Sequence, residues 1–575
     1  MRTACMTLAV SVWMAVGVLA GLAKAQPDVW VETTTNRVCR SEGPPAKPAR
    51  EINLAAARNE WVSFQVFVRS PDSLRGVGIE LSTLKSQTGA EIGSTCVRIY
   101  REHQLELKEA TYRNDAFRAD WYPDPLIPTQ HPLTGASLSG PRFTAQPFDL
   151  PANETHGFWV DVFIAKDVVP GIYEGTLRII SQQGQIAAMP VRLEAWDFTL
   201  PRVPALVTAL GSPAARMRDY YSRRAKEGKE AEPTDWSAVE KQCAILAQEH
   251  RINAYPPGDW LRLERDGEGF KLAKENIQKL QEWIDTYHVN AIQVPSPVGI
   301  VKDPHANKQT LQAWAKAWDQ AIDSINRPHV VYFIYLKDEP NDPEEYEFVR
   351  LWGKPIRETK TKVKVMVVEQ TLTQNPSWGD LYGAVDIWCS LFPLYDEPTA
   401  RKRQALGEVM WAYTALCQGK KTPWWHIDYP LLNYRLPCWM AYRYDIRGLL
   451  YWGGMSHWSQ VEDPWTDPRT YRPGQSSRPL IFNVEGTLVY PARPCGYDGI
   501  VPSLRLKALR EGIEDFDYFA ILQQAGRGTQ ALEIVRRLTP SWFELNPEPQ
   551  AYEQARRELA KLILTLPKEV RNPTW

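Results

Sequence analysis

Two adjacent carboxylates end an apolar segment near the middle of the chain. Residues 330–336 read Val-Val-Tyr-Phe-Ile-Tyr-Leu, which predicts a parallel strand covered on both faces, and Lys337, Asp338 and Glu339 follow at once. Cleavage of a glycosidic bond needs a proton donor for the leaving oxygen and a group that stabilises the positive charge at the anomeric carbon. Two adjacent carboxylates can supply both functions. The competing interpretation is a solvated acidic turn in which Glu339 caps the next helix.

Other carboxylates leave a second mechanism open. If the substrate carries a 2-acetamido group, its carbonyl oxygen can attack the anomeric carbon, and the pair then needs no protein nucleophile. Glu369 follows a predicted strand, and Asp428 lies in the sequence Trp-Trp-His-Ile-Asp-Tyr. Either is a candidate nucleophile for a two-carboxylate mechanism, in which the carboxyl groups stand about 5 Å apart. Glu369 can equally be an exposed strand end.

Aromatic side chains are candidates for contact with a sugar ring. The chain has 23 Trp and 24 Tyr, and such rings offer a flat apolar face with a polar tip. Trp388 lies inside a predicted strand, where core packing is the default, as it is for Trp411. The candidates at or just beyond predicted strand ends are Tyr413, Tyr451, Trp452 and Trp458. Among these, Tyr413 is the candidate for bonding an acetamido carbonyl.

The elements that would position these residues form an α/β pattern. Short apolar runs alternate with segments of helical period, such as 272–284 and 311–325. The predicted strands are 206–210, 252–255, 291–294, 330–336, 363–368, 385–390, 409–416 and 449–452. Eight such strands predict a (β/α)8 TIM barrel, with the active site at the carboxyl ends of the strands. An open doubly wound sheet is less favoured, because no glycine-rich G-x-G-x-x-G turn follows a strand.

The remaining chain divides on either side of this barrel, which we place at residues 205–502. Residues 26–204 show short alternating runs broken by turn residues, which predict an N-terminal β-sandwich domain. Residues 503–575 form a C-terminal helical segment, with helices expected over 503–525 and 530–566. Within it, Arg510 and Glu514 are four residues apart and are expected to pair on the helix surface.

The first 25 residues match a secretory signal peptide with cleavage near Ala25. We therefore expect a secreted or periplasmic protein. The net charge of −1 becomes about −3 without the signal peptide, which gives no attraction for nucleic acid or an anionic membrane. Neither membrane insertion nor a metal or other cofactor is expected, because no later apolar stretch is long enough to span and no metal motif is present. At least one of the seven remaining cysteines is expected to be unpaired.

Residues 335–340, Tyr-Leu-Lys-Asp-Glu-Pro, resemble the catalytic Asp-Glu motif of glycoside hydrolase family 123, whose members are β-N-acetylgalactosaminidases. Residues 57–60, 120–126 and 170–173 resemble the sandwich domain of related proteins. Residues 448–452 and 503–515 resemble the last barrel strand and the helix after it. The resemblance implies that Glu339 is the general acid/base, that Asp338 orients the acetamido group, and that the anomeric configuration is retained.

Three functions follow from these observations. The favoured one is hydrolysis of β-linked N-acetylhexosaminides, with N-acetylgalactosaminides first, by substrate assistance. The first alternative is a glycosidase of other specificity that uses two separated carboxylates. The second is a carbohydrate-binding surface protein without catalysis, so a glycan or oligosaccharide is the expected partner in each case. The sequence gives no oligomeric state.

Overall fold

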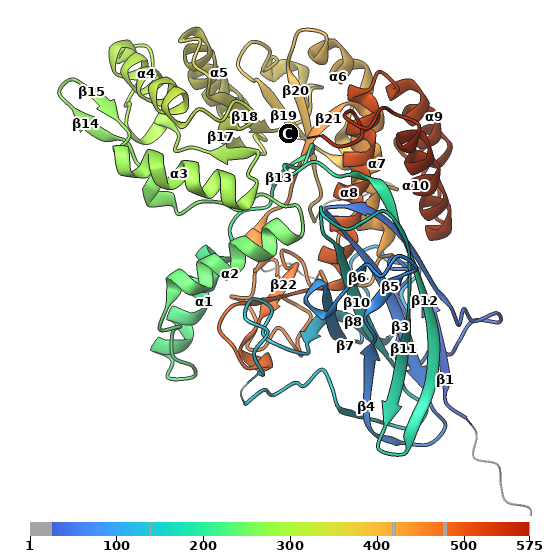
Figure 1. Cartoon of the computed structure of the whole chain (residues 1–575). Coiled ribbons are helices and arrows are strands. Elements are labelled where there is room, and N and C mark those ends of the chain that lie inside the picture. The colour runs from blue at the N-terminus through green and yellow to red at the C-terminus, as the bar shows by residue number, and fades with distance from the viewer. Residues whose placement is uncertain (1–25, 139, 417, 419–420, 475–479, 574–575) are drawn as a thin grey trace, which may run out of the picture.

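The computed structural model describes residues 26–138, 140–416, 418, 421–474 and 480–573. The expected signal peptide, residues 1–25, lies outside the described residues. Two sheets made by the N-terminal part of the chain lie beside a parallel barrel, and the last helices of the chain pack against both (Figure 1).

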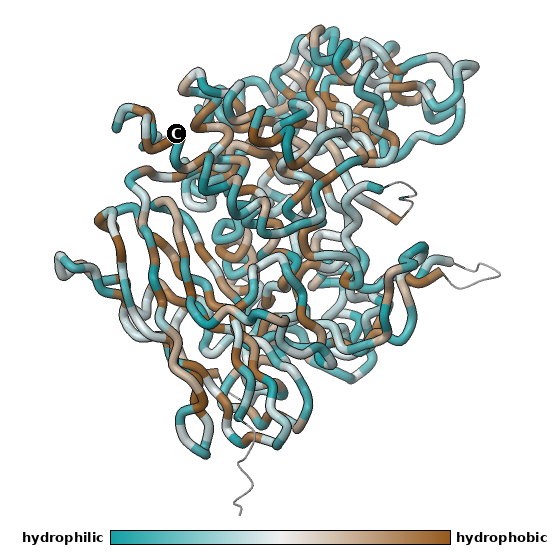
Figure 2. Tube along the Cα trace, turned by 90° about the vertical axis from the view of Figure 1, so that its right-hand side faces the viewer, coloured by the Kyte–Doolittle hydropathy of each residue, from teal (hydrophilic) through white to brown (hydrophobic). Residues whose placement is uncertain are grey.

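The N-terminal sheets share one hydrophobic core. The five-stranded sheet has the order β1 (Asp28–Glu32), β3 (Glu60–Arg69), β10 (Thr155–Ile164), β7 (Val97–Leu107) and β8 (Asp120–Pro128). The second has the order β2 (Ile52–Arg58), β12 (Gly184–Thr199), β11 (Gly171–Ser181), β4 (Leu74–Leu81) and β9 (Phe148–Leu150); β5 (Leu84–Ser86) also pairs with β11, and β6 (Glu91–Ile92) pairs with β5. Alternate residues such as Phe64 and Val66 of β3 face Leu177 and Ile179 of β11 in the core. Figure 2 shows this alternation of apolar and polar residues along the strands.

A nearly closed barrel of seven parallel strands forms the centre of the molecule. Its order is β13 (Val207–Ala209), β21 (Ile446–Leu450), β20 (Val409–Tyr413), β19 (Ile387–Leu391), β18 (Lys364–Val368), β17 (Val331–Asp338) and β16 (Ala291–Gln293). Every neighbouring pair is parallel. Phe333, Met366, Cys389 and Trp411 fill the interior. All carboxyl ends therefore lie at one edge, which we call the carboxyl edge.

The predicted strand at 252–255 is wrong, and the eight-stranded barrel is corrected to seven strands. At this point the chain passes between β13 and β16 without a ladder. Asn253 takes the place of the ladder, because its backbone N–H and side-chain amide donate to Thr208, each at 2.9 Å. The Asn253 side-chain oxygen accepts from Asn290 N, also at 2.9 Å. Pro256 and Pro257 follow and have no N–H to continue a strand.

Helices surround the barrel and close the chain. They are α1 (Pro213–Lys226), α2 (Trp236–Glu249), α3 (Lys274–Tyr287), α4 (Lys308–Ile325), α5 (Pro343–Glu358), α6 (Glu397–Gln404), α7 (Leu432–Tyr444), α8 (Leu504–Gln524), α9 (Gly528–Leu538) and α10 (Pro549–Leu564). The helical periods at 272–284 and 311–325 thus become α3 and α4. The region predicted as helical over 530–566 is two helices, separated by residues 539–548. Two small hairpins, β14 (Glu264–Asp266) with β15 (Gly269–Lys271) and β22 (Val489–Pro491) with β23 (Ile500–Pro502), complete the fold.

Helix α8 joins the barrel to the N-terminal sheets through buried charges. Arg510 and Glu514 do interact electrostatically, but the expected surface location is wrong, because both side chains are buried. Arg510 binds Asp161 of β10 at 2.7 Å, and Glu514 accepts a hydrogen bond from Trp61 N at 3.1 Å. Lys507 also binds Asp161, at 2.7 Å. The helix is therefore enclosed by two parts of the protein rather than lying on its surface.

Two expectations from composition can be compared with the structure. No helix among the described residues is long and apolar enough to cross a membrane. Six cysteines are described, and all six have free thiols, five of them buried.

Candidate active site

A bulge in β17 directs Asp338 toward the barrel interior. The pairing of β17 with β18 shifts between Tyr335 and Lys337, so Leu336 is an extra residue on β17. In an uninterrupted strand, Lys337 would share the interior face with Tyr335. Instead Lys337 binds Glu345 of α5, on the helix side of the strand. Asp338 now lies on the face of Tyr335, whose hydroxyl donates to Asp338 Oδ1 at 2.5 Å.

The backbone at Glu339 brings the second carboxylate to the same side. Glu339 has φ of 38°, in the left-handed region that costs energy for residues with a side chain. Successive residues of a strand normally point to opposite faces. The left-handed turn removes that alternation, and Glu339 Oε1 accepts a hydrogen bond from the hydroxyl of Tyr413 at the end of β20. Both carboxylates are exposed at the carboxyl edge.

Two tyrosines hold the carboxylate pair from the interior. Burial, and then the adjacent carboxylates, raise the pKa of both phenols: Tyr413 beside Glu339 and Tyr335 beside Asp338. Both hydroxyls therefore stay protonated and act as hydrogen-bond donors. The interpretation of Glu339 as a helix cap is wrong, since Asp342 caps α5 by accepting from Glu345 N at 2.8 Å.

Glu369 follows β18 and lies next to this pair, but it is enclosed. Only 4% of the residue is exposed, and its carboxylate accepts from Tyr346 at 3.1 Å and from Gln374 at 3.1 and 3.2 Å. Gln374 also donates to Pro340 O at 3.1 Å, beside the turn of Asp338 and Glu339. Burial raises the pKa of Glu369 to about 7, and the charge of Glu339 contributes in the same direction. Through Gln374, Glu369 thus supports the turn that contains Asp338 and Glu339.

Asp428 binds the N-terminal part of the chain. Its two carboxylate oxygens accept from Thr111 N at 2.8 Å and Thr111 Oγ1 at 2.6 Å. Asn114 donates to the same carboxylate at 3.1 Å. These contacts occupy both oxygens, so Asp428 joins the loop after β20 to the segment between β7 and β8.

Most of the aromatic candidates lie in the core. Trp388 and Trp458 are at most 1% exposed, and Tyr451 is 2% exposed. The indole of Trp388 donates to Glu408 at 2.6 Å on the helix side of the barrel, and that of Trp458 donates to Val489 O at 3.0 Å. Trp411 fills the barrel interior. Of the residues proposed to contact substrate, Tyr413 touches the carboxylate pair and Trp452 is half-buried at the carboxyl edge.

Sequence reasoning missed Tyr335 and Glu485. Tyr335 belongs to the strand pattern and to the 335–340 motif, but neither gives it a role of its own; its contact with Asp338 arises through the bulge. Glu485 is 1% exposed, accepts from the indole N–H of Trp452, and lies 3.2 Å from His426 Nδ1. No predicted strand, predicted helix or motif contains Glu485, so no signal in the sequence marks it.

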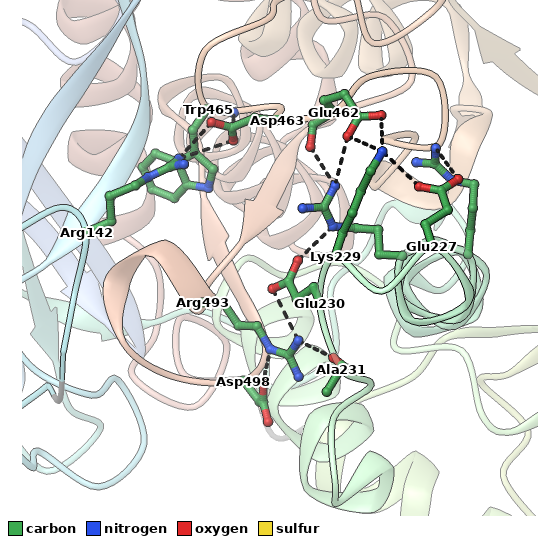
Figure 3. Close-up of polar contacts among 12 residues, drawn as sticks. Arg142, Glu227, Lys229, Glu230, Ala231, Glu462, Asp463, Trp465, Arg493 and Asp498 are labelled. Atoms are coloured by element: carbon green, nitrogen blue, oxygen red, sulfur yellow. Dashed lines mark hydrogen bonds and ion pairs between the residues drawn. The ribbon is translucent and has the colours of Figure 1, made fainter.

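Glu485 belongs to a long segment, residues 453–503, between β21 and α8. Ion pairs fix this segment to its surroundings (Figure 3). Glu462 binds Lys229 at 2.9 Å, Arg493 binds Glu230 at 3.2 Å, and Asp463 binds Arg142 at 2.9 Å. The segment is therefore held both by the loop after α1 and by the N-terminal part of the chain.

The site offers acid–base chemistry from side chains. Among the described residues, no group of three or more His, Cys, Asp and Glu is arranged to hold a metal ion. A parallel barrel with two carboxylates at its carboxyl edge is an arrangement that glycoside hydrolases use.

Comparisons with known proteins identify the class and then the family. A model of the glycoside hydrolase 123 catalytic domain matches residues 234–522, and a model of the glycoside hydrolase 123 N-terminal domain matches residues 30–181. The protein is thus a glycoside hydrolase. It belongs to glycoside hydrolase family 123.

One solved structure has a similar fold over nearly the whole chain. A family 123 glycoside hydrolase from Clostridium perfringens, studied for glycolipid glycan hydrolysis, matches with a TM-score of 0.63 at 12% identity, over 94% of this chain and 97% of that one. A family 39 glycoside hydrolase from Bacteroides cellulosilyticus matches with a TM-score of only 0.32 at 10% identity, over 76% of this chain and 82% of that one. Comparison with curated proteins finds no match.

Proposed function

We propose that this protein hydrolyses β-linked N-acetylhexosaminides, N-acetylgalactosaminides first, by substrate-assisted catalysis with retention. The observation that carries the proposal is the adjacent carboxylate pair, with both side chains on one side of the barrel and each held by its own tyrosine. The two acids therefore have fixed and separate positions, so that one can act as the general acid/base while the other orients the acetamido group.

In the first step, Glu339 donates its proton to the glycosidic oxygen as the bond to the anomeric carbon breaks. The carbonyl oxygen of the substrate's own acetamido group attacks that carbon and forms a cyclic oxazolinium. Asp338 accepts a hydrogen bond from the acetamido nitrogen and stabilises its positive charge. Water then attacks the anomeric carbon, Glu339 takes the water's proton, and the ring opens with the original configuration.

The contacts of the other acids support this mechanism over a protein nucleophile. Both oxygens of Asp428 bind Thr111 and Asn114. The carboxylate of Glu369 is enclosed by donors from Tyr346, Gln370 and Gln374. A nucleophile must instead present a free oxygen to the anomeric carbon.

The test compares hydrolysis of aryl β-N-acetylgalactosaminide, β-N-acetylglucosaminide and β-galactoside by the wild type, Glu339→Gln and Asp338→Asn. Asp428→Asn serves as a matched control acid. Turnover confined to acetamido sugars, lost in both pair variants and kept in the control, is expected. Activity on the plain galactoside, or activity that survives both pair variants, would overturn the mechanism. Sugar binding without turnover in the wild type would favour the non-catalytic alternative.

The proposal extends to architecture and location. Two sheets with one shared core support a β-sandwich for the N-terminal part, and seven parallel strands with an Asn253 bridge support a TIM barrel that lacks its second strand. The signal sequence supports secretion or export to the periplasm. If the signal peptide is cleaved near Ala25, N-terminal sequencing of the exported protein should begin at or near Gln26.

A further inference from the structure

Trp452 is placed at the carboxyl edge next to the strand of Tyr413. Leu450, the last residue of β21, pairs with Tyr413 of β20, whose hydroxyl holds Glu339. Trp452 is two residues further, about 7 Å along the chain direction. Its ring is half-buried and lies against His457 and Tyr471, with centroid distances of 4.9 and 5.1 Å. Two neighbouring rings thus support the indole, and part of the residue stays exposed just beyond the carboxyl end of β21.

Glu485 fixes the polar end of this ring. Its Oε1 accepts from Trp452 Nε1, and its Oε2 lies 3.2 Å from the buried His426. The residue is 1% exposed, and burial raises its pKa to about 7. An acid in this environment costs stability unless its contacts offset the lost solvation. No step of the proposed mechanism uses it.

The turn that presents Glu485 has a left-handed residue on each side, and the one at Val484 is strained. Val484 has φ of 61° and Gly486 has φ of 70°. A β-branched residue in the left-handed region is a true outlier, and such strain persists where the surroundings impose it. A Cβ at position 486 would come within 2.8 Å of the His457 side chain and 3.2 Å of the Trp452 ring. The turn is therefore fitted closely against the ring.

We propose that Glu485 is a positioning residue that locks the Trp452 indole as a sugar-contacting wall of the active site. The inference rests on the proposed function, since the wall has a purpose only if a sugar binds at the carboxyl edge. The carboxylate fixes the ring plane through a charge-assisted hydrogen bond, so that no rotamer freedom is lost when substrate binds.

The protein contains a matched control for this contact. Glu408 is also buried and accepts from an indole N–H, that of Trp388, at 2.6 Å. That pair faces the helix layer, where Arg403 binds Glu408. Loss of the Glu408 carboxylate should therefore cost stability without affecting substrate.

The kinetic test uses Glu485→Ala, Glu485→Gln, Trp452→Phe, the double variant Glu485→Ala/Trp452→Phe, and Glu408→Ala. Glu485→Ala and Trp452→Phe should each lower kcat/KM roughly 10-fold, mainly through KM. The double variant should be no worse than the poorer single one, and Glu485→Gln, which keeps an acceptor oxygen, should restore most of the loss. Glu408→Ala should leave kcat/KM within about 2-fold. Equal kinetic losses in the Glu485 and Glu408 variants would overturn the proposal.

A second measurement needs no turnover. In protein labelled with 5-fluorotryptophan, the ¹⁹F resonance of Trp452 is the one lost in Trp452→Phe. It should move or broaden in Glu485→Ala, stay in place in Glu408→Ala, and shift when N-acetylgalactosamine is added. In the wild type it should titrate with Glu485, whose charged and titratable neighbours are His426, Tyr451 and Arg505. A resonance unchanged by Glu485→Ala would overturn the inference.

The two proposals fail differently. Turnover only of glycosides without the acetamido group would overturn the proposed substrate, and the variants would then be compared on that glycoside. A protein without turnover would be judged on the ¹⁹F resonance alone.

Discussion

Tyr413 donates its hydroxyl hydrogen to Glu339, so the phenol fixes the position of the proposed acid/base. Tyr413→Phe keeps the ring in the barrel interior and removes only the donor. Loss of a hydrogen bond to a charged group costs about 1.5–3 kcal/mol, which predicts roughly a 10- to 100-fold lower kcat. The measurement is steady-state kinetics beside a thermal melt. An unchanged kcat would mean that Glu339 does not need this contact.

Glu369 predicts a pH dependence of stability. Burial raises its pKa to about 7 in the folded protein, above its ordinary value. Its contribution is therefore fully present below the unfolded pKa and is lost as pH rises through about 7, on the order of 3 kcal/mol. Glu369→Gln removes this titration. The difference in melting temperature between the variant and the wild type should shift in favour of the variant from pH 5 to pH 8; a difference independent of pH contradicts the prediction.

The sequence located the carboxylate pair and Tyr413 because all three lie at the ends of apolar strands. It could not sort the tryptophans, since a barrel strand is apolar on both faces. In β19, Cys389 faces the interior while its neighbour Trp388 faces the helices, and the pattern does not distinguish the two directions. Glu485 lies 33 residues after Trp452 and outside every predicted strand and helix, so only the folded chain brings the two residues together.

Helix α5 follows the turn of Asp338 and Glu339, and it packs closely against the backbone that precedes β19. A Cβ on Gly353 would lie 2.2 Å from Ala384 O. Since a backbone atom cannot move aside easily, Gly353→Ala should cost about 1–3 kcal/mol and lower the melting temperature. The exposed Gly258 has no atom within 4 Å of its added Cβ, so Gly258→Ala is the control. Equal melting temperatures for the two variants would contradict this packing.

Strand prediction succeeded where an apolar run forms backbone hydrogen bonds to a neighbouring strand. It failed where side-chain hydrogen bonds replace that ladder. Residues 252–255 have the composition of a strand, but Asn253 binds Thr208 and Asn290 through its amide. The bulge at Leu336 was also outside prediction, because nothing in an apolar run marks which residue is extra. Yet this residue decides whether Asp338 or Lys337 faces the interior.

The buried ion pairs between the N-terminal sheets and α8 contribute to the stability of the whole molecule. Burial alone would raise the pKa of Asp161, but Arg510 and Lys507 hold it well below its ordinary value. Asp161→Asn leaves both cations buried without their carboxylate and should cost about 3–5 kcal/mol. Asp197, which binds Arg58 and Arg571 near the surface, is the control, and Asp197→Asn should cost less than about 1 kcal/mol. Denaturant unfolding of both variants measures the difference, and equal losses would contradict it.

The charges of α8 look like surface positions in the sequence, since Arg510 and Glu514 have the spacing of a helix pair. Their partners lie more than 340 residues away, on strands that the same pattern analysis assigns to another domain. Local spacing carries no information about contacts of that range.

The long sequence separation between Asp161 and its cations also affects how the chain folds during synthesis. The ribosome completes β10 long before it reaches Lys507 and Arg510, 346 and 349 residues later, a delay on the order of 20–70 s at ordinary elongation rates. Until then Asp161 has no cation, and the surface awaiting α8 stays open. The N-terminal sheets of the nascent chain therefore lack their contact with α8 until the end of the polypeptide is synthesised. A chain truncated before residue 504 would lack this contact permanently.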